Sequence, residues 1–192
     1  MSTNFNLARL NENGSVDYIY VHWNGSPEDM IPVFLRGEYD ASKINTVIEH
    51  GFASAIYENL GEQHDFDDHR LSLDNKWCVF YHRDRGDELE ILHKEDFSKF
   101  VEEMSGDIHI EYCYLLLPDG RFVWTPASRK TPANLSDWRE VGVESMTHYI
   151  ANEAAYSDEK YRVGHLERAK ALLEEMESLE KATALLDEMS DK

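Results

Sequence analysis

The sequence predicts an α+β fold in which an antiparallel sheet with interspersed helices precedes a C-terminal helical hairpin or extension. Three observations lead to this prediction: apolar residues at strand spacing in the middle of the chain, a Pro118-Asp119-Gly120 connection with hairpin chemistry, and helical spacing after residue 137. We expect residues 1–137 to form the α+β domain. Residues 138–192 are expected to form an acidic helical segment that packs on the domain or serves for association.

The first part of the chain predicts a strand followed by two helices. Residues 16–23 are rich in Tyr, Ile and Val, which is typical of a strand. Ser26 is a favourable N-cap and Pro27 fits the first position of a helix, so a helix is expected to begin there. Asp40 is expected to cap a second helix that ends at Gly51.

The middle of the chain predicts an exposed loop and then a sheet. Residues 62–74 are polar and lack periodicity, which is typical of a loop. Lys76–His82 is apolar at both alternating sets of positions, which indicates a central strand covered on both faces. The other elements expected here are a strand over Leu89–His93, a helix from Phe97 to near Gly106, and hairpin strands over Ile108–Leu117 and Arg121–Trp124.

The last part of the chain predicts two helices after a Pro-containing stretch at residues 125–137. The stripe of apolar residues along the second of these helices is too short to require a coiled coil. A helical hairpin packed on the sheet is therefore preferred, and a dimerisation helix is the alternative. The first stripe contains Val143, Met146, Ile150 and Ala154, and the second helix, capped by Ser157, contains Ala169, Leu172 and Met176.

Charge excludes several classes of function. The chain has 38 acidic and 19 basic residues, a net charge of −19, and such a surface repels nucleic acid phosphates and anionic lipid. We expect no direct binding to nucleic acid or to a membrane. The first residues lack a signal-peptide pattern, and the longest strongly apolar run, Tyr112–Leu117, is far shorter than the ~20 residues of a membrane span. A cytoplasmic location is expected, with Cys78 and Cys113 as buried thiols rather than a disulfide.

The segment from His64 to His69 is a weak candidate for a metal site. It contains two imidazoles and three carboxylates, which are ligand types that zinc, manganese or iron accept. The two histidines are not at the spacing that places ligands on one face of a helix, and metal ligands need rigid support. A solvated acidic loop is the preferred interpretation, and no cofactor is expected.

Common enzyme signatures are absent from the sequence, so no catalytic residue is predicted. His82-Arg83-Asp84 matches the start of the protein kinase catalytic loop, but Leu89 stands where that loop needs Asn. The segment is better interpreted as a charged turn in which Arg83 and Arg85 pair with nearby acids.

Two turns are candidates for contact with a ligand or partner. The turn over His22–Ser26 and the turn over Tyr81–Asp87 both follow strands, and we expect them to lie close together. The preferred interpretation of the first turn is a core tryptophan, a buried histidine and a capped turn, since buried aromatic residues at strand ends are ordinary. The candidate residues are His22, Trp23, Asn24, His82, Asp84 and Arg85.

The same turns carry a resemblance to a known group of proteins. Tyr20–Glu28 and Tyr81–Gly86 resemble the VHWDGYPE and YHRDRG blocks of an uncharacterised family of small phage, prophage and mobile-element proteins, over roughly Ser15–Trp124. Asn24 and Ser26 stand where the family often has Asp and Tyr. The resemblance implies an accessory protein that binds and disables host defence machinery, and it implies no catalytic residues.

These observations favour stoichiometric binding of an acidic surface to a basic host protein such as a nuclease, a restriction enzyme or a CRISPR effector. The expected activity is inhibition of host defence, of the anti-CRISPR or anti-restriction type. The alternatives are a metal-dependent enzyme that uses the His/Asp-rich loop and a homo-oligomeric structural protein, with a possible homodimer through the C-terminal helices. The acidic interaction surface is expected to include Asp65, Asp67, Asp68, Glu174, Glu175, Glu177 and Glu180.

Overall fold

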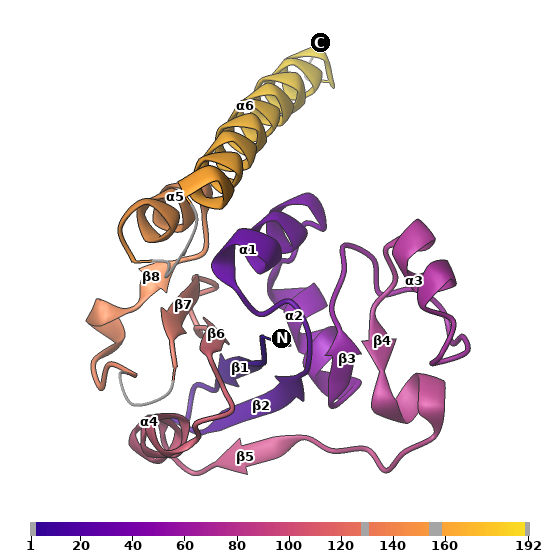
Figure 1. Cartoon of the computed structure of the whole chain (residues 1–192), viewed down its shortest axis with the longest axis vertical. Helices are drawn as coiled ribbons and strands as arrows, with labels where there is room; N and C mark the ends of the chain where they lie inside the picture. The colour runs from indigo at the N-terminus through magenta and orange to yellow at the C-terminus, as the bar shows by residue number, and fades with distance from the viewer. Residues whose placement is uncertain (1–2, 128–130, 154–158, 191–192) are drawn as a thin grey trace. The chain divides into compact units, whose positions relative to one another are not determined.

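An eight-stranded mixed sheet organises the first of two compact units of the chain, which ends at Val141 (Figure 1). The computed structural model describes residues 3–127, 131–153 and 159–190, with the side chains of the last helix up to residue 178. The predicted α+β class is confirmed. The strands are β1 (Phe5–Leu10), β2 (Val16–Val21), β3 (Ala53–Ala55), β4 (Val79–Phe80), β5 (Leu92–Lys94), β6 (Tyr112–Leu116), β7 (Phe122–Pro126) and β8 (Arg139–Glu140).

The sheet is mixed rather than antiparallel throughout. Its strand order is β4-β3-β2-β1-β6-β7-β8, and β5 pairs with β2. β1 runs parallel to β6 and β2 runs parallel to β3, whereas the other neighbours are antiparallel. Neither β1 nor β3 is predicted from the sequence, and both parallel pairings involve one of these strands.

β1 lies at the centre of the sheet because both of its faces are covered. Phe5 and Leu7 on one face and Ala8 on the other have no exposed surface. Asn6 is also buried, and its amide donates a hydrogen bond to Met104 Sδ at 2.8 Å. This polar residue interrupts the apolar run that is typical of a strand covered on both faces.

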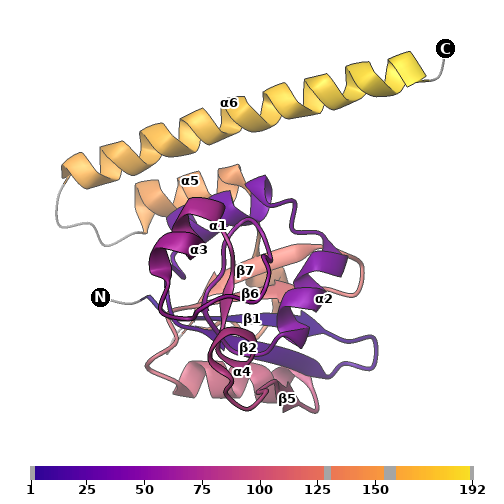
Figure 2. The ribbon, with the colours of Figure 1, turned by 90° about the vertical axis from the view of Figure 1, so that its right-hand side faces the viewer.

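Helices cover both faces of the sheet in this unit (Figure 1, Figure 2). The helices of this unit are α1 (Pro27–Arg36), α2 (Ala41–Glu49), α3 (His69–Asn75), which lies beside the edge strand β4 in Figure 1, and α4 (Phe97–Gly106), with a π-helical turn η1 (Tyr81–Arg85) and a 3₁₀ turn η2 (Leu135–Asp137). Phe100 of α4 packs against Tyr18 from one face, with ring centroids 5.1 Å apart. Phe34 of α1 packs against Tyr114 from the other face, also at 5.1 Å. The core therefore has two layers, one on each side of the sheet.

Local signals account for the helices that the sequence predicts correctly. The Asp40 carboxylate accepts a hydrogen bond from the Lys43 N–H at 2.8 Å and caps α2 as expected. Ser26 occupies the N-cap position of α1, but its hydroxyl donates to the Asp29 carboxylate at 2.9 Å instead of accepting from the helix backbone. The helix beginning at Phe97 is confirmed as α4.

The hairpin around Pro118–Gly120 is also confirmed, because β6 and β7 pair antiparallel on either side of it. The first of its strands is shorter than the predicted Ile108–Leu117. Ile108 precedes β6 and is 65% exposed, whereas every residue of β6 is buried.

The loop expected over residues 62–74 is wrong for its second half, which begins helix α3 at His69. The Asp68 carboxylate accepts a hydrogen bond from the Leu71 N–H at 2.9 Å and so caps the helix. An Asp at an N-cap position is a helix signal, but Asp65 and Asp67 stand close by, so the sequence does not show which aspartate is the cap.

The central strand expected over Lys76–His82 is also wrong, because only Val79–Phe80 forms a strand and it lies at the edge of the sheet. Lys76 adopts a left-handed conformation with φ of 56°, which ends α3 and interrupts an extended chain. After Phe80 the backbone turns into the π-helical turn η1.

Residues 142–192 form the second compact unit, with helices α5 (Val143–Asn152) and α6 (Glu159–Ser190) in contact with each other. Met146, Ile150 and Leu172 of the predicted stripes are buried. Ala154 and Ser157 lie outside the described residues, as does the side chain of Glu180. Packing of this unit on the domain, or its use for association, stays a prediction.

Among the described residues, no helix has the length and apolar character that a membrane span requires. Cys78 and Cys113 are both buried and unpaired, as expected.

Candidate functional site

A cavity of about 290 Å³ opens beside the turn that follows β2. Two large apolar side chains at this cavity, Trp23 and Leu73, are 44% and 57% exposed. Tryptophan is enriched among the residues that contribute most to binding at protein interfaces, so this exposed pair is a candidate contact surface. The lining comes from the β2 turn, from β3 and the segment after it, from α3 and from β4, and it consists of Trp23, Asn24, Ser54, Ala55, Tyr57, His69, Ser72, Leu73 and Val79.

The β2 turn holds Trp23 in place through its backbone. The Trp23 N–H donates to Ser54 O at 3.0 Å, and the Gly25 N–H donates to Thr3 O at 2.8 Å. The Tyr114 hydroxyl donates to Gly25 O at 2.9 Å. A Cβ at Gly25 would lie 2.8 Å from the Phe5 side chain, so this close approach requires glycine. The preferred interpretation of Trp23 as a core tryptophan is wrong, because 44% of this residue is exposed.

His22 is not among the residues that line this cavity, and it contacts the neighbouring aromatic residues Tyr20 and Trp23. Its Nδ1 lies 2.6 Å from the Tyr20 hydroxyl, and its ring contacts Trp23 with centroids 4.7 Å apart. His22 is partly buried and packs against the indole.

Arg83 and Asp84 form a buried ion pair inside the π-helical turn. The guanidinium donates from Nε to Asp84 Oδ1 at 2.8 Å and from Nη2 to Oδ2 at 3.0 Å. It also donates to Leu60 O at 2.9 Å and to Cys78 O at 2.6 Å. The Asp84 side chain has no exposed surface and also accepts the Phe80 N–H at 2.8 Å. The pair therefore satisfies backbone groups of β4 and of the residue before it, at the edge of the sheet.

His64 lies on the other side of this ion pair, and its side chain is only 2% exposed. Its backbone N–H donates to Asp84 Oδ1 at 3.3 Å. Its ring Nδ1 lies 2.8 Å from Glu62 O and 3.6 Å from Asp84 Oδ1, and its Nε2 lies 3.1 Å from Ser72 Oγ. Both ring nitrogens are engaged within the protein.

His69, the second metal candidate, is exposed and lines the cavity, whereas the His64 ring is buried. Within the ranges that the structure describes, no group of three or more His, Cys, Asp or Glu side chains is placed to hold a metal ion.

The remaining candidates, His82 and Arg85, lie on the exposed side of the π-helical turn. Arg85 pairs with Asp87, which holds the pKa of the Asp87 carboxyl below its usual value. The Arg85 guanidinium also stacks over Tyr81, 4.5 Å from the ring centroid. His82 Nδ1 lies 2.7 Å from Asp87 O. The predicted pairing of Arg83 and Arg85 with nearby acids is thus present.

The two candidate turns flank the short strand β3. The Trp23 N–H bonds to Ser54 O, and the Tyr81 N–H bonds to Phe52 O at 3.0 Å, so the two turns meet residues only two positions apart, from the two sides of β3. The cavity takes Trp23 and Asn24 from the first turn and no residue from the second. A role of both turns in contacting one ligand stays a prediction.

Acidic residues border the cavity on the side of α3. Asp65, Asp67 and Asp68 are exposed and lead directly into this helix. Residues 62–75 contain five carboxylates and one arginine, and that arginine, Arg70, lies 3.5 Å from Asp74. On α6, the predicted surface residues Glu174, Glu175 and Glu177 are exposed.

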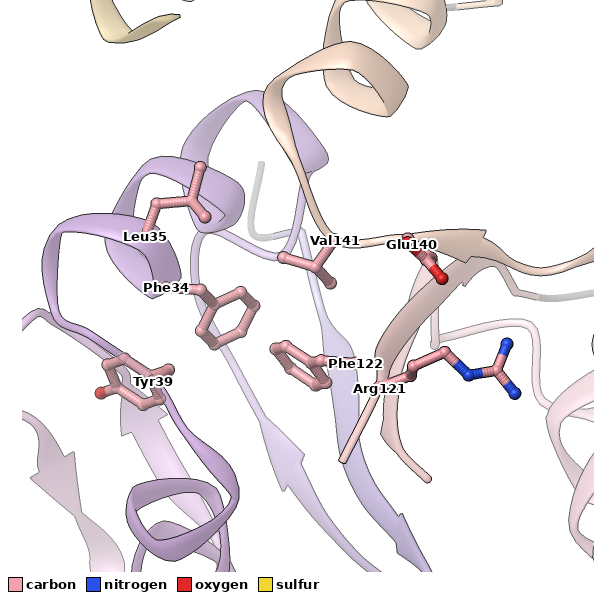
Figure 3. A pocket seen from close by; sticks show the side chains of 7 residues that line it. All are labelled: Phe34, Leu35, Tyr39, Arg121, Phe122, Glu140 and Val141. Atoms are coloured by element: carbon pink, nitrogen blue, oxygen red, sulfur yellow. The ribbon is translucent and has the colours of Figure 1, made fainter. Parts of the chain in front are cut away.

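A second, smaller cavity of about 180 Å³ lies between α1 and the start of β7 (Figure 3). Its wall is aromatic, with Phe34, Tyr39 and Phe122 turned toward one another, and Arg121 and Glu140 stand at its rim. The Tyr39 hydroxyl donates to Tyr57 O at 2.5 Å, and burial raises the pKa of this phenol. This cavity is not predicted from the sequence, because its residues come from separate elements.

Comparison with protein-family models, with curated proteins and with solved structures gives no match.

Proposed function

We propose that this protein acts by stoichiometric binding to a basic host protein, through the surface around the Trp23 cavity. The observation that carries the proposal is an exposed indole and an exposed leucine beside a cavity whose border is acidic. Tryptophan in a pocket is the side chain most often found at the energetic centre of a protein interface. Surrounding charge steers the approach of an oppositely charged partner.

The chemistry of this surface favours a lysine or arginine side chain of the partner. A guanidinium or ammonium group gains cation–π attraction over Trp23 and is attracted by Asp65, Asp67 and the other carboxylates of residues 62–75. The apolar stem of the same side chain packs against Leu73. The surface is unsuited to phosphates, since it holds one arginine against five carboxylates.

The resemblance to phage and mobile-element proteins supplies the biological setting of the proposal. The protein acts in the host cytoplasm, and its targets are nucleases, restriction enzymes or CRISPR effectors, whose basic nucleic-acid surfaces match its charge. This is inhibition of a host defence system by occupancy and not by turnover.

The test uses the full chain and the double variant Trp23→Ala/Leu73→Ala as bait in a bacterial lysate, followed by titration of each captured protein after purification. We expect a captured basic protein to bind the wild type at one copy per target and the double variant at least ~30-fold more weakly, as for the loss of an interface centre of ~2 kcal/mol. The matched control is Ile108→Ala, another exposed apolar residue far from this cavity in the sequence. Equal binding by the double variant, or an effect at far below one copy per target, contradicts the proposal.

Association through the C-terminal helix is a second candidate. Tyr161 and Leu173 of α6 are 67% and 45% exposed, which is apolar surface available to a second copy. Light scattering tests this homodimer, and a monomer over the micromolar range rejects it.

A further inference from the structure

We propose that Ser72 and His64 form a nucleophile and general-base pair that hydrolyses a small carboxylic ester bound in the 290 Å³ cavity. This activity goes beyond the proposed partner binding and does not depend on it. The observation is the hydrogen-bond distance of 3.1 Å between Ser72 Oγ and His64 Nε2, at a serine that lines the cavity. Nucleophile and base within such a distance are the first requirement for acyl transfer.

The contacts of His64 fix the tautomer that a general base needs. Nδ1 lies 2.8 Å from Glu62 O, and a backbone carbonyl accepts hydrogen bonds but cannot donate one. The neutral ring therefore carries its proton on Nδ1, and Nε2 presents its lone pair to the Ser72 hydroxyl. This is the arrangement in which a serine–histidine pair reacts.

Asp84 acts as a positioning residue behind the base. Its Oδ1 lies 3.6 Å from His64 Nδ1 and accepts the His64 backbone N–H, so it fixes the residue and stabilises the imidazolium that forms during reaction. Arg83 neutralises this buried carboxylate in the resting protein. The ring of Trp77, with its centroid 5.7 Å from that of His64, closes the other side of the imidazole.

The cavity supplies the other parts of a site for a small ester. Trp23 and Leu73 give an apolar wall for the acyl group, and the carboxamide of Asn24 is a donor for the carbonyl oxygen. Asn24 holds a left-handed backbone conformation with φ of 64°, of the kind that is found at functional turns. The volume of about 290 Å³ is at the small end of ligand sites, so the substrate is a short-chain ester.

The reaction proceeds in two steps. Ser72 Oγ bonds to the ester carbonyl carbon while its proton moves to His64 Nε2, and the C–O bond to the alcohol then breaks as that alcohol takes the proton. Water attacks the acylated Ser72, again giving a proton to His64, and the carboxylic acid leaves as the serine regains the proton. At rest the Ser72 hydroxyl also lies 3.2 Å from Asp68 O, so the hydroxyl must turn to His64 before it reacts.

The test measures hydrolysis of p-nitrophenyl acetate and p-nitrophenyl butyrate by the full chain, with intact-protein and peptide mass spectrometry after exposure to a fluorophosphonate. We expect turnover, one phosphonate per chain mapped to Ser72, and loss of both in Ser72→Ala, with the rate at least ~100-fold lower. Ser98→Ala is the matched control, since Ser98 is exposed and its hydroxyl bonds only the local Asp96 carboxylate at 2.6 Å.

Several results overturn the assignment. The assignment is wrong if the phosphonate labels a residue other than Ser72 in the folded wild type. It is also wrong if Ser72→Ala hydrolyses the esters at the wild-type rate. His64→Gln adds a second arm, in which the circular dichroism spectrum establishes folding and labelling at Ser72 is expected to disappear. If His64→Gln does not fold, Ser72→Ala still tests the assignment, because this substitution removes only one oxygen atom and is expected to leave the fold intact. Partner binding is measured separately, in the capture experiment with the wild-type chain, so failure of the esterase and failure of partner binding are separate results.

Discussion

Arg83 and Asp84 are neighbours in the sequence, yet they form a buried bidentate ion pair that joins the loop at Leu60–His64 to the end of β4. Adjacent residues of a strand point to opposite faces and cannot pair in this way. The π-helical turn brings both side chains to the same side. The π-helical turn is therefore what allows the buried ion pair to form directly after the short strand β4. Asp84 of this pair also holds His64 by accepting its backbone N–H.

Breaking this pair should strongly destabilise the domain. Asp84→Asn and Arg83→Ala each leave a buried partner without its opposite charge, and we expect a loss of about 3–5 kcal/mol in the free energy of unfolding. Chemical denaturation followed by tryptophan fluorescence measures it. The control is Asp87→Asn at the exposed Arg85–Asp87 pair, which should leave the unfolding midpoint unchanged. Equal effects at the two pairs would contradict the buried role of Arg83 and Asp84.

Gly25 should not tolerate a side chain, because its Cα faces the Phe5 ring and Thr3 O at the point where the β2 turn meets β1. We expect Gly25→Ala to lower the melting temperature and to reduce binding at the Trp23 cavity together. Gly106→Ala is the control, since a Cβ there meets nothing within 4 Å at the end of α4. A melting temperature for Gly25→Ala at or above that of the wild type would show that the turn is loose.

Sequence reasoning succeeds where the signal is local. The Ser26-Pro27 start of α1, the Asp40 cap of α2 and the Pro118–Gly120 hairpin each depend on a few adjacent residues, and all three elements are present. It fails for β1, because Asn6 in this strand is satisfied by Met104, a residue 98 positions away. Burial of a polar side chain by such a distant partner leaves no periodic pattern.

The site divides in the same way. Trp23 and Asn24 are among the predicted contact residues, and both line the cavity. They could be predicted because Asn24-Gly25 is a turn signal that is visible in the sequence. Ser72 and His64 are brought together by the cap at Asp68 and by the ion pair that holds residue 64, and Asp84 enters from 20 residues further along the chain. Neither the spacing nor the composition of residues 62–74 distinguishes this buried histidine from the exposed His69.

Stability should fall at low pH through Asp17, which joins three strands. Burial favours the neutral carboxyl, but hydrogen bonds from His93, Asn11 and Arg9 prevail and hold the pKa of Asp17 below its ordinary value of 3.8. A lowered pKa in the folded state means that Asp17 stabilises the protein above pH ~4 and that this contribution is lost as the pH falls through the folded pKa.

Denaturant titrations at several pH values between 7 and 3 measure the effect. Asp17→Asn should be less stable than the wild type at pH 7, and the difference should shrink toward the acid end. Glu12→Gln, an exposed carboxyl in the β1–β2 turn, is the control. A difference between Asp17→Asn and the wild type that stays constant with pH would assign the loss to packing instead of charge.

Salt and charge variants should separate steering from contact in the proposed interface. The carboxylates of residues 62–75 act at long range, and their reach shortens as the Debye length falls from ~10 Å at 0.1 M to ~3 Å at 1 M ionic strength. The association rate with the basic partner should therefore fall steeply with salt.

Asp65→Asn/Asp67→Asn should slow association more than it speeds dissociation, measured by surface plasmon resonance. Asp68 is left in place because it caps α3 through the Leu71 N–H. Trp23→Ala should show the opposite pattern, with faster dissociation and little change in association, because the indole acts only on contact. An association rate that is independent of both salt and the two aspartates would reject the acidic surface as the docking face.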